Sequence, residues 1–210
     1  QLAETYQGGA ERFLNTVGNR LEGCLPLPKL MWLREHESET YARIRHVLIS
    51  SKDYLIAQLT GECVGDVAAC STAGAMNIRN GQWDAELCEA AGIDMTMLPH
   101  LHNPQDNIGA VTESAAQRTG FFAGTAVYAG IGDAGATTLA SGVSHPCQYN
   151  INIGTSGWIA TVSPEPFTDK PGAANLAFGV EEGFVNAVPY LNAGDVHKWV
   201  TGVFADGDYA

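Results

Sequence analysis

One carboxylate in the sequence has glycines on both sides, in the segment Gly130-Ile131-Gly132-Asp133-Ala134-Gly135. Asp133 follows an apolar stretch, 126–130, that predicts a β-strand, and it precedes a small-residue stretch, 136–141, that predicts a helix. Glycines allow a ligand to approach the backbone closely, and ligands of α/β proteins usually bind at strand ends. Asp133 could therefore accept a hydroxyl proton, bind Mg²⁺, or cap a helix beginning at Ala134. The residues alone favour the capping role.

A second glycine-flanked segment, Gly154-Thr155-Ser156-Gly157, separates two stretches that predict β-strands, 148–153 and 158–162. Successive backbone N–H groups in such a turn can converge on one point and hold phosphate oxygens. The same pattern is also typical of an ordinary hairpin turn, and the residues alone favour that simpler interpretation.

Other catalytic patterns are incomplete. Ser156 does not form a G-x-S-x-G nucleophile elbow, because Trp158 occupies the position of the last glycine. No GK[ST] phosphate loop occurs. His100, His102 and Asp106 lie in a proline-containing stretch without a fourth metal ligand, so we expect a solvated loop there.

The spacing of apolar and turn residues predicts the elements that position these groups. Helices are expected in the N-terminal stretch 1–22, from residue 29, after a turn within 43–60, and at 83–91, 112–119 and 193–204. Two hairpins are expected, one joining 148–153 to 158–162 and one joining 178–180 to 184–188. Strands and hairpins followed by packed helices predict an α/β protein with a mixed sheet.

The composition of the chain restricts its partners and its location. The 210 residues include 23 acidic and 11 basic side chains, for a net charge of −12, and such a surface repels nucleic acid. No apolar run approaches the length of a membrane span, so we expect no membrane partner. The five cysteines form no C-x-x-C pair, which predicts reduced thiols and a cytoplasmic location.

The order of the segments resembles the FGGY family of carbohydrate kinases. Residues 26–33 are similar to its P-x-x-K-x-x-W-L signature, and residues 52–62 to its KDYL…LTGE stretch. Gly132-Asp133 and the turn 154–157 follow in family order. The resemblance extends in order from residue 24 to residue 204, and its specificity comes from the combination of motifs.

The resemblance implies an actin-like, two-lobed fold with ribonuclease-H-like cores. Residues 1–143 would belong to the N-terminal, sugar-binding lobe, and residues 144–210 to the first part of the C-terminal, ATP-binding lobe. Asp133 would be the catalytic base. Gly154, Thr155 and Ser156 would face the ATP phosphates, and Gly194 and Lys198 would contact the nucleotide.

Some family features are missing from the chain. It lacks the D-x-G-T-type phosphate loop and sugar contacts upstream of Lys29, and it lacks the later glycine-rich adenosine segment. We therefore expect a central fragment, incomplete at both ends and inactive by itself. Ala73 stands where family members commonly have Thr, and Ala134 where several have Asn or Gln beside the base in contact with the sugar. These two alanines leave the identity of the sugar open.

The resulting hypothesis is ATP- and Mg²⁺-dependent phosphorylation of a sugar or polyol, with D-xylulose favoured over gluconate and glycerol. A second hypothesis is a non-catalytic sugar-binding or regulatory protein on a kinase-derived scaffold. A third is an actin-like ATPase that needs no sugar. Association into a homodimer is a further hypothesis.

Overall fold

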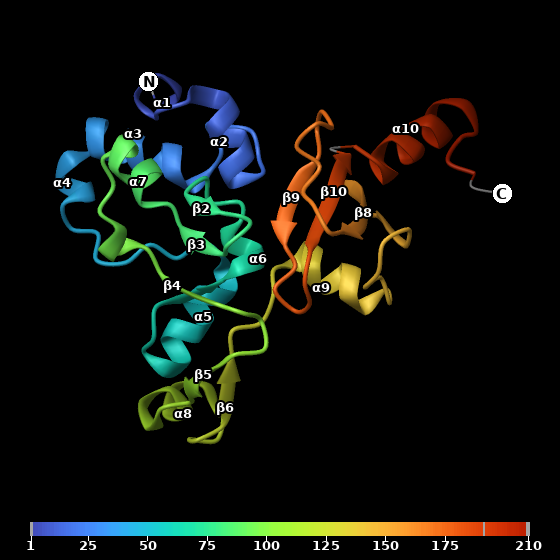
Figure 1. Cartoon of the computed structure of the whole chain (residues 1–210). Helices are drawn as coiled ribbons and strands as arrows, with labels where there is room; N and C mark the ends of the chain where they lie inside the picture. Colours follow the sequence, from blue (N-terminus) through green and yellow to red (C-terminus); the bar gives the residue numbers. More distant parts are fainter. Residues whose placement is uncertain (1, 191, 209–210) are drawn as a thin grey trace.

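The computed structural model describes residues 2–190 and 192–208 of the chain. It consists of two parts that lie side by side (Figure 1), which we call the N-terminal part and the C-terminal part. The N-terminal part contains α1 (Leu2–Thr5), α2 (Gly9–Val17), α3 (Pro26–His36), α4 (Ser38–Tyr41), α5 (Ser51–Thr60), β1 (Val64–Asp66), α6 (Val67–Cys70), β2 (Met76–Asn77), β3 (Gln82–Trp83), α7 (Ala85–Ala91), the 3₁₀-helix η1 (Met95–Met97), β4 (His100–His102), β5 (Asn107–Ala110), α8 (Glu113–Thr119) and β6 (Ala126–Tyr128). The C-terminal part contains α9 (Asp133–Ala140), β7 (Tyr149–Ile153), β8 (Gly157–Ser163), β9 (Ala174–Ala177), β10 (Phe184–Tyr190) and α10 (Gly194–Phe204).

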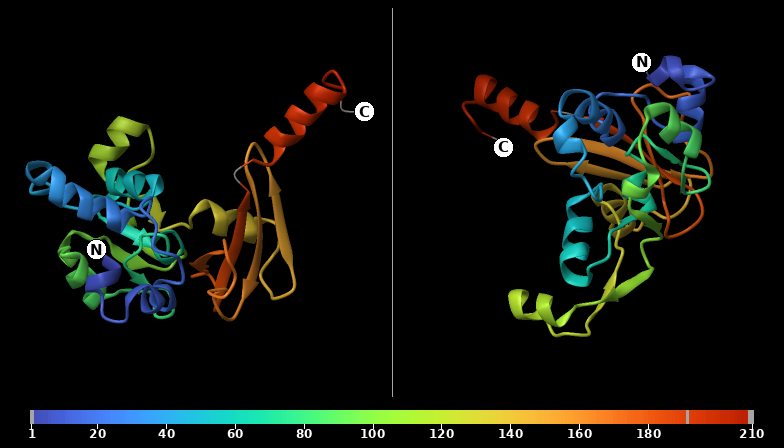
Figure 2. Two further views of the ribbon diagram at one scale, coloured as in Figure 1. Left: turned by 90° about the horizontal axis from the view of Figure 1, so that it is seen from above. Right: turned by 90° about the vertical axis from the view of Figure 1, so that its left-hand side faces the viewer.

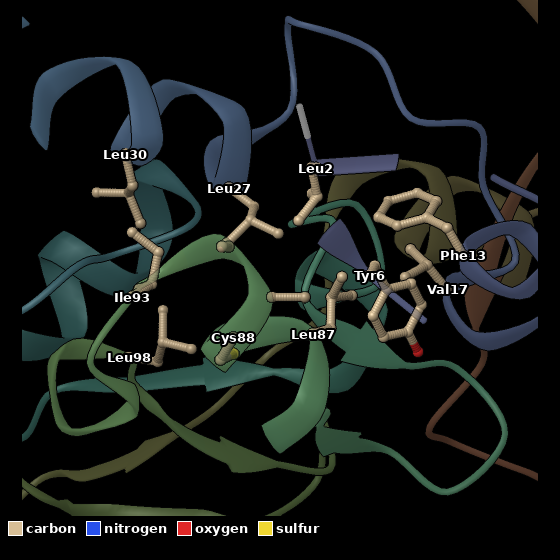
Figure 3. Packing of buried hydrophobic residues seen from close by; sticks show 12 residues of the cluster. Leu2, Tyr6, Phe13, Val17, Leu27, Leu30, Leu87, Cys88, Ile93 and Leu98 are labelled. Atoms are coloured by element: carbon tan, nitrogen blue, oxygen red, sulfur yellow. The ribbon is translucent and has the colours of Figure 1, made fainter. Parts of the chain in front are cut away.

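The core of the N-terminal part forms between α2, α3 and α7. Helix α2 places Phe13 and Val17, four residues apart, on one buried face. Leu27 from α3 and Leu87 from α7 are also buried in this cluster, whose side chains point toward one another in Figure 3. Burial of side chains of this size stabilises the fold by roughly 1.5–3 kcal/mol each. Short strand pairs complete this part: β1 pairs with β4 in parallel, and β2–β3 and β5–β6 are antiparallel.

Local capping chemistry sets several helix ends, and it corrects two of the predicted ones. Helix α8 begins after Thr112, whose side chain accepts from the Ala115 N–H, as predicted. Helix α7 begins at Ala85 rather than at residue 83, because the Asp84 side chain caps it. In the stretch 43–60 the helix begins at Ser51, after a non-helical stretch as predicted, whereas α3 begins at Pro26 rather than at residue 29, because proline is favoured in the first helical position.

The C-terminal part is a four-stranded antiparallel sheet in the order β7-β8-β10-β9. Both predicted hairpins are present, but the first strand of the second one is 174–177 instead of 178–180. Phe178 instead starts the loop, where its N–H donates to the Gly183 carbonyl at 3.0 Å. Helix α9 packs against β8 and β10, and Phe178 and Val185 are fully buried in the core of this part.

Helix α10 leaves the end of β10 and extends away from the sheet (Figure 2). It was predicted, and its bounds are Gly194–Phe204. Its predicted apolar face, represented by Trp199 and Val203, is exposed by 63% and 54%. No helix in the described ranges has the length and apolar character needed to cross a bilayer.

Buried polar side chains join the two parts along the edge of β9 that pairs with no other strand of the sheet. The Asn19 side chain donates to the Asn175 carbonyl at 2.7 Å and accepts from the Asn175 N–H at 2.8 Å. The Ala177 N–H donates to the Ser71 hydroxyl at 2.8 Å, and the Asn175 side chain donates to the Gly18 carbonyl. An edge strand that would otherwise expose its backbone groups is thus satisfied by the N-terminal part. The division of the chain at residue 143 stays a prediction.

Candidate functional site

Asp133 is the first residue of α9, and the chain reaches it through the loop 129–132 that follows β6. The N-cap of α9 is Gly132, so Asp133 does not occupy the cap position considered for it, although its side chain contacts a first-turn amide. The carboxylate is exposed, and its Oδ1 accepts from the N–H of Ala134 at 2.8 Å. Within the described ranges it forms no ion pair. Asp133 is therefore available to a ligand.

Asp133 lines a cavity of about 550 Å³ that involves both parts of the molecule. Its lining comprises Ile49, Ser50, Ser51, Lys52, Ala69, Thr72, Ile131, Gly132, Asp133 and Leu176. Residues 49–52 surround the start of α5, and residues 69 and 72 belong to α6 and the turn after it. Leu176 comes from β9, between the two residues that hydrogen-bond to the N-terminal part. The contacts between the two parts therefore lie directly behind one wall of the cavity.

Ala134, predicted to contact the sugar beside the base, packs against the core of the C-terminal part and is half-buried. It does not line the cavity that contains Asp133. Its contribution to sugar binding stays a prediction.

A cluster of three charged groups lies beside this cavity, and one of them, Lys52, lines it. The Lys52 ammonium lies 2.7 Å from Oδ1 of Asp53 and 2.7 Å from Oδ2 of Asp66. Both carboxylates are fully buried, whereas the Lys52 side chain is 24% exposed. Burial by itself would lower the pKa of Lys52, but hydrogen bonds and attraction to the two carboxylates outweigh it and raise that pKa.

Each carboxylate of this cluster also anchors a helix start. Asp53 accepts from the N–H of Ser50 at 2.9 Å at the start of α5. Asp66 accepts from the N–H groups of Ala68 and Ala69, both at 3.0 Å, and so caps α6. The lysine thus joins two helix starts at the cavity. Sequence analysis used this Lys-Asp pair only as a family signature, although an Asp three residues after a Ser at a helix start was a local signal for a cap.

The second predicted site forms around the turn between β7 and β8. Gly154, Thr155 and Ser156 form this turn, which joins two antiparallel strands, as expected. The Gly194 N–H donates to the Gly154 carbonyl at 2.8 Å, and the Ala193 N–H donates to the Thr155 carbonyl at 2.9 Å. The structure therefore brings three predicted nucleotide contacts together, residues 154, 155 and 194, although they lie some 40 positions apart in the sequence.

The turn leaves backbone donors available. Within the described ranges, the N–H groups of Thr155 and Ser156 have no acceptor. They lie beside the start of α10, whose aligned peptide dipoles place partial positive charge at that end. Lys198 lies one turn further along α10 and is exposed, and within the described ranges no hydrogen bond or ion pair joins it to the turn. Successive free N–H groups next to a helix start are suited to an anion such as phosphate.

The cavity of Asp133 and the turn 154–156 are separate in the structure. Asp133 lines the cavity between the two parts, whereas Gly194 lines another cavity of about 440 Å³ against β7 and β10. In the described ranges no three His, Cys, Asp or Glu side chains are grouped to hold a metal ion. His100 and His102 lie on strand β4 rather than in a loop, and His102 pairs with Asp106 at 3.4 Å.

Comparison with known proteins agrees with this architecture. A xylulose kinase of Lactococcus lactis is 32% identical over 209 residues, which cover 99% of this chain and 41% of that protein. An autoinducer-2 kinase of Klebsiella pneumoniae is 33% identical over 170 residues, which cover 80% of this chain and 32% of that protein. The chain therefore spans less than half the length of these curated relatives.

Solved structures show the same fold. The crystal structure of xylulose kinase from Rhodospirillum rubrum superimposes with a TM-score of 0.87 and is 28% identical, covering 95% of this chain and 41% of that one. This similarity confirms the actin-like sugar-kinase fold that the sequence predicts. Residues 1–140 match the FGGY family of carbohydrate kinases, N-terminal domain. On this match over most of its length, the chain belongs to the FGGY family of carbohydrate kinases.

Proposed function

We propose that the protein transfers the γ-phosphoryl group of ATP to a hydroxyl group of a sugar or polyol, with Asp133 as the general base. The observation that carries this proposal is the placement of Asp133. It is an exposed carboxylate at a helix start, without an ion-pair partner in the described ranges, on the wall of a cavity between two parts. Membership of the FGGY family supports the reaction class.

The chemistry needs a base of this kind. A sugar hydroxyl is a weak nucleophile until a carboxylate accepts its proton, and such general-base catalysis contributes roughly 10²–10⁴-fold to the rate. Asp133 is not neutralised by a neighbouring cation in the described ranges, so it can accept that proton. Phosphoryl transfer otherwise depends on positioning and charge stabilisation, which the two parts would supply to the two substrates.

ATP would bind through its phosphates to the turn 154–156 and the start of α10. The free N–H groups of Thr155 and Ser156 would donate to phosphate oxygens. Mg²⁺ usually retains several waters and takes one or two carboxylates together with the phosphates, so it needs no preformed protein cage. Asp195, the exposed carboxylate in the first turn of α10 beside the turn 154–156, would hold the ion. When bound, Mg²⁺ neutralises charge on the phosphates.

An uncharged ketose such as D-xylulose is the favoured substrate. Asp133 and Lys52 line the cavity, and the fully buried carboxylates of Asp53 and Asp66 lie against Lys52, so three carboxylates stand against one cation there. This excess of negative charge disfavours an anionic substrate such as gluconate. The relatives named as xylulose kinases support the same choice.

The test is Asp133→Asn in the full-length protein, with ADP release measured against a panel of sugars. We expect kcat to fall by roughly 10²–10⁴-fold while sugar binding, measured by calorimetry, changes little. Stability should also be retained, because the Asn Oδ1 can still accept from the Ala134 N–H. Asp169→Asn is the matched control, since it removes an exposed carboxylate that does not line the cavity of Asp133.

The outcomes separate the alternatives. Turnover of Asp133→Asn within a few-fold of wild type would contradict the assignment of the base. Sugar binding by the wild-type protein without any ADP release would indicate the non-catalytic binding protein instead. ADP release that does not respond to any added polyol would indicate an actin-like ATPase.

A further inference from the structure

We propose that Lys52 is a second substrate-binding residue, whose ammonium group donates a hydrogen bond to an oxygen of the sugar that Asp133 deprotonates. The inference rests on the proposed function and adds to it a sugar contact from the N-terminal part. Asp133 and Lys52 line the same cavity from opposite parts of the chain, 81 positions apart in the sequence.

The segment that carries Asp133 packs directly over the lysine. A Cβ atom placed on Gly130 would lie 3.8 Å from Cδ of Lys52, and one on Gly132 would lie 3.5 Å from Cβ of Ala69. The aliphatic stem of Lys52 therefore lies beside Gly130, and its side chain, 24% exposed, lines the cavity. A ligand in this cavity would lie between Asp133 and Lys52, which both line it.

The ammonium group retains donor capacity. It has three N–H donors and no acceptor. Asp53 takes one as a hydrogen bond, and Asp66 is placed to take a second as an ion pair. In the part of the chain that the structure describes, no further acceptor contacts this group. At least one N–H is thus free for a ligand oxygen.

A hydroxyl group of Ser50 adds an independent indication of a polar ligand. Ser50 lines the same cavity; its buried Oγ faces the Asp53 N–H in the capping box of α5, but within the described ranges no hydrogen bond at ordinary distance satisfies it. A buried polar group left unpaired costs roughly 1–3 kcal/mol. A sugar hydroxyl can accept from Lys52 and donate to Ser50 at once, because a hydroxyl is both donor and acceptor.

The charge balance points to a neutral oxygen rather than a phosphate. Asp53 and Asp66 together carry more negative charge than Lys52 carries positive charge, so the cluster has a net charge of about −1. A phosphate group would be repelled by this cluster despite the lysine. An uncharged hydroxyl or carbonyl oxygen gains the hydrogen bond without that repulsion.

The first experiment needs no substitution. The full-length wild-type protein is acetylated with a low dose of acetic anhydride, with and without D-xylulose, and each lysine is quantified by mass spectrometry. If an ADP-release panel selects another sugar, that sugar is the probe. We expect the sugar to reduce acetylation of Lys52 severalfold and to leave the exposed Lys29 and Lys170 unchanged. Equal acetylation of Lys52 with and without saturating sugar would overturn the proposal.

The second experiment compares Lys52→Met/Asp66→Asn with Asp66→Asn alone. The double variant keeps the net charge of the wild-type cluster, and the Oδ1 of the introduced asparagine would still cap α6. Thermal melting verifies that both variants fold. Sugar affinity is measured by calorimetry for the probe sugar and for each of its monodeoxy analogues. We expect the double variant to bind the sugar at least tenfold more weakly than Asp66→Asn and to lose discrimination against one analogue.

The result that would overturn the assignment is sugar affinity within threefold of Asp66→Asn for every analogue. Such a result would reduce Lys52 to a structural cation. Calorimetry also distinguishes this failure from failure of the proposed function. In the second case the wild-type protein itself binds and phosphorylates no sugar.

Discussion

A single added methyl group at Gly194 tests whether the start of α10 holds the phosphate-binding turn. A Cβ atom at this position would lie 2.5 Å from the carbonyl oxygen of Gly154 and 3.3 Å from its carbonyl carbon. To reach an ordinary contact of 3.4 Å, the turn and the helix start must separate by about 0.9 Å. The methyl group of Gly194→Ala therefore meets backbone atoms of Gly154, which cannot move aside as a flexible side chain could.

The expected magnitude follows from the hydrogen bonds that this displacement breaks. The bonds from the N–H groups of Gly194 and Ala193 to the carbonyls of Gly154 and Thr155, at 2.8 and 2.9 Å, join the turn to the helix. At roughly 0.5–1.5 kcal/mol each, their loss destabilises the folded state by about 1–3 kcal/mol. If the same misplacement reaches the N–H groups that bind phosphate, the KM for ATP rises by roughly 10-fold or more.

Gly202→Ala is the matched control within the same helix. A Cβ atom at Gly202 would meet nothing within 4 Å, and this position is inside α10. Replacing a helical glycine with alanine stabilises by roughly 0.5–1 kcal/mol. Glycine-to-alanine substitution should thus lower the free energy of unfolding at position 194 and raise it at position 202, eight residues away.

The assay combines urea unfolding with ADP-release kinetics in the full-length protein. Gly194→Ala should lower the unfolding midpoint and raise the KM for ATP, while the KM for the sugar stays within a few-fold. Gly202→Ala should leave both KM values unchanged. If Gly194→Ala behaves like Gly202→Ala in stability and in the KM for ATP, the turn is not held by the helix start and the reasoning is refuted.

Three further predictions concern stability and reactivity. Asn175→Leu should lower the free energy of unfolding by roughly 2–4 kcal/mol, because buried backbone groups lose their partners; Asn80→Leu, on the surface, should change it by less than about 1 kcal/mol in the same urea titration. Burial, with a smaller contribution from a nearby carboxylate, raises the pKa of Cys88 to about 11, so iodoacetamide at neutral pH should modify the exposed Cys147 first; equal rates by mass spectrometry would contradict this. Protonated Lys52 stabilises the fold, because its pKa is higher in the folded than in the unfolded state. This stabilisation is complete below the unfolded pKa of 10.5 and is lost as the pH rises through the folded pKa. Lys52→Met should lack that alkaline loss in pH-dependent melting.

Features that depend on near neighbours in the chain were predictable from the sequence. Thr112 begins α8 as predicted, and Gly92 and Gly120 end α7 and α8 in left-handed conformations that glycine adopts without strain. The hairpin 149–163 follows from two apolar stretches around a glycine-rich turn. These are local signals, because the groups that satisfy one another lie within a few residues.

The second hairpin shows where local signals were insufficient. Phe178 is apolar and fully buried, so the sequence indicated a strand at 178–180, yet it lies in the loop. The strand is 174–177, whose backbone is paired with β10 on one side and with Asn19 and Ser71 on the other. Those partners come from the N-terminal part, more than 100 residues earlier, so no local pattern could identify them.

By itself, the sequence determined the order of the family motifs, the glycine-flanked position of Asp133 and the glycine-rich turn 154–157. Only the tertiary structure decided that Lys52 lies in the cavity of Asp133 and that Gly194 lies against Gly154. The physical reason is that helix ends and turns depend on hydrogen bonds between near neighbours. A cavity depends on side chains from distant segments, which meet only when the two parts pack together.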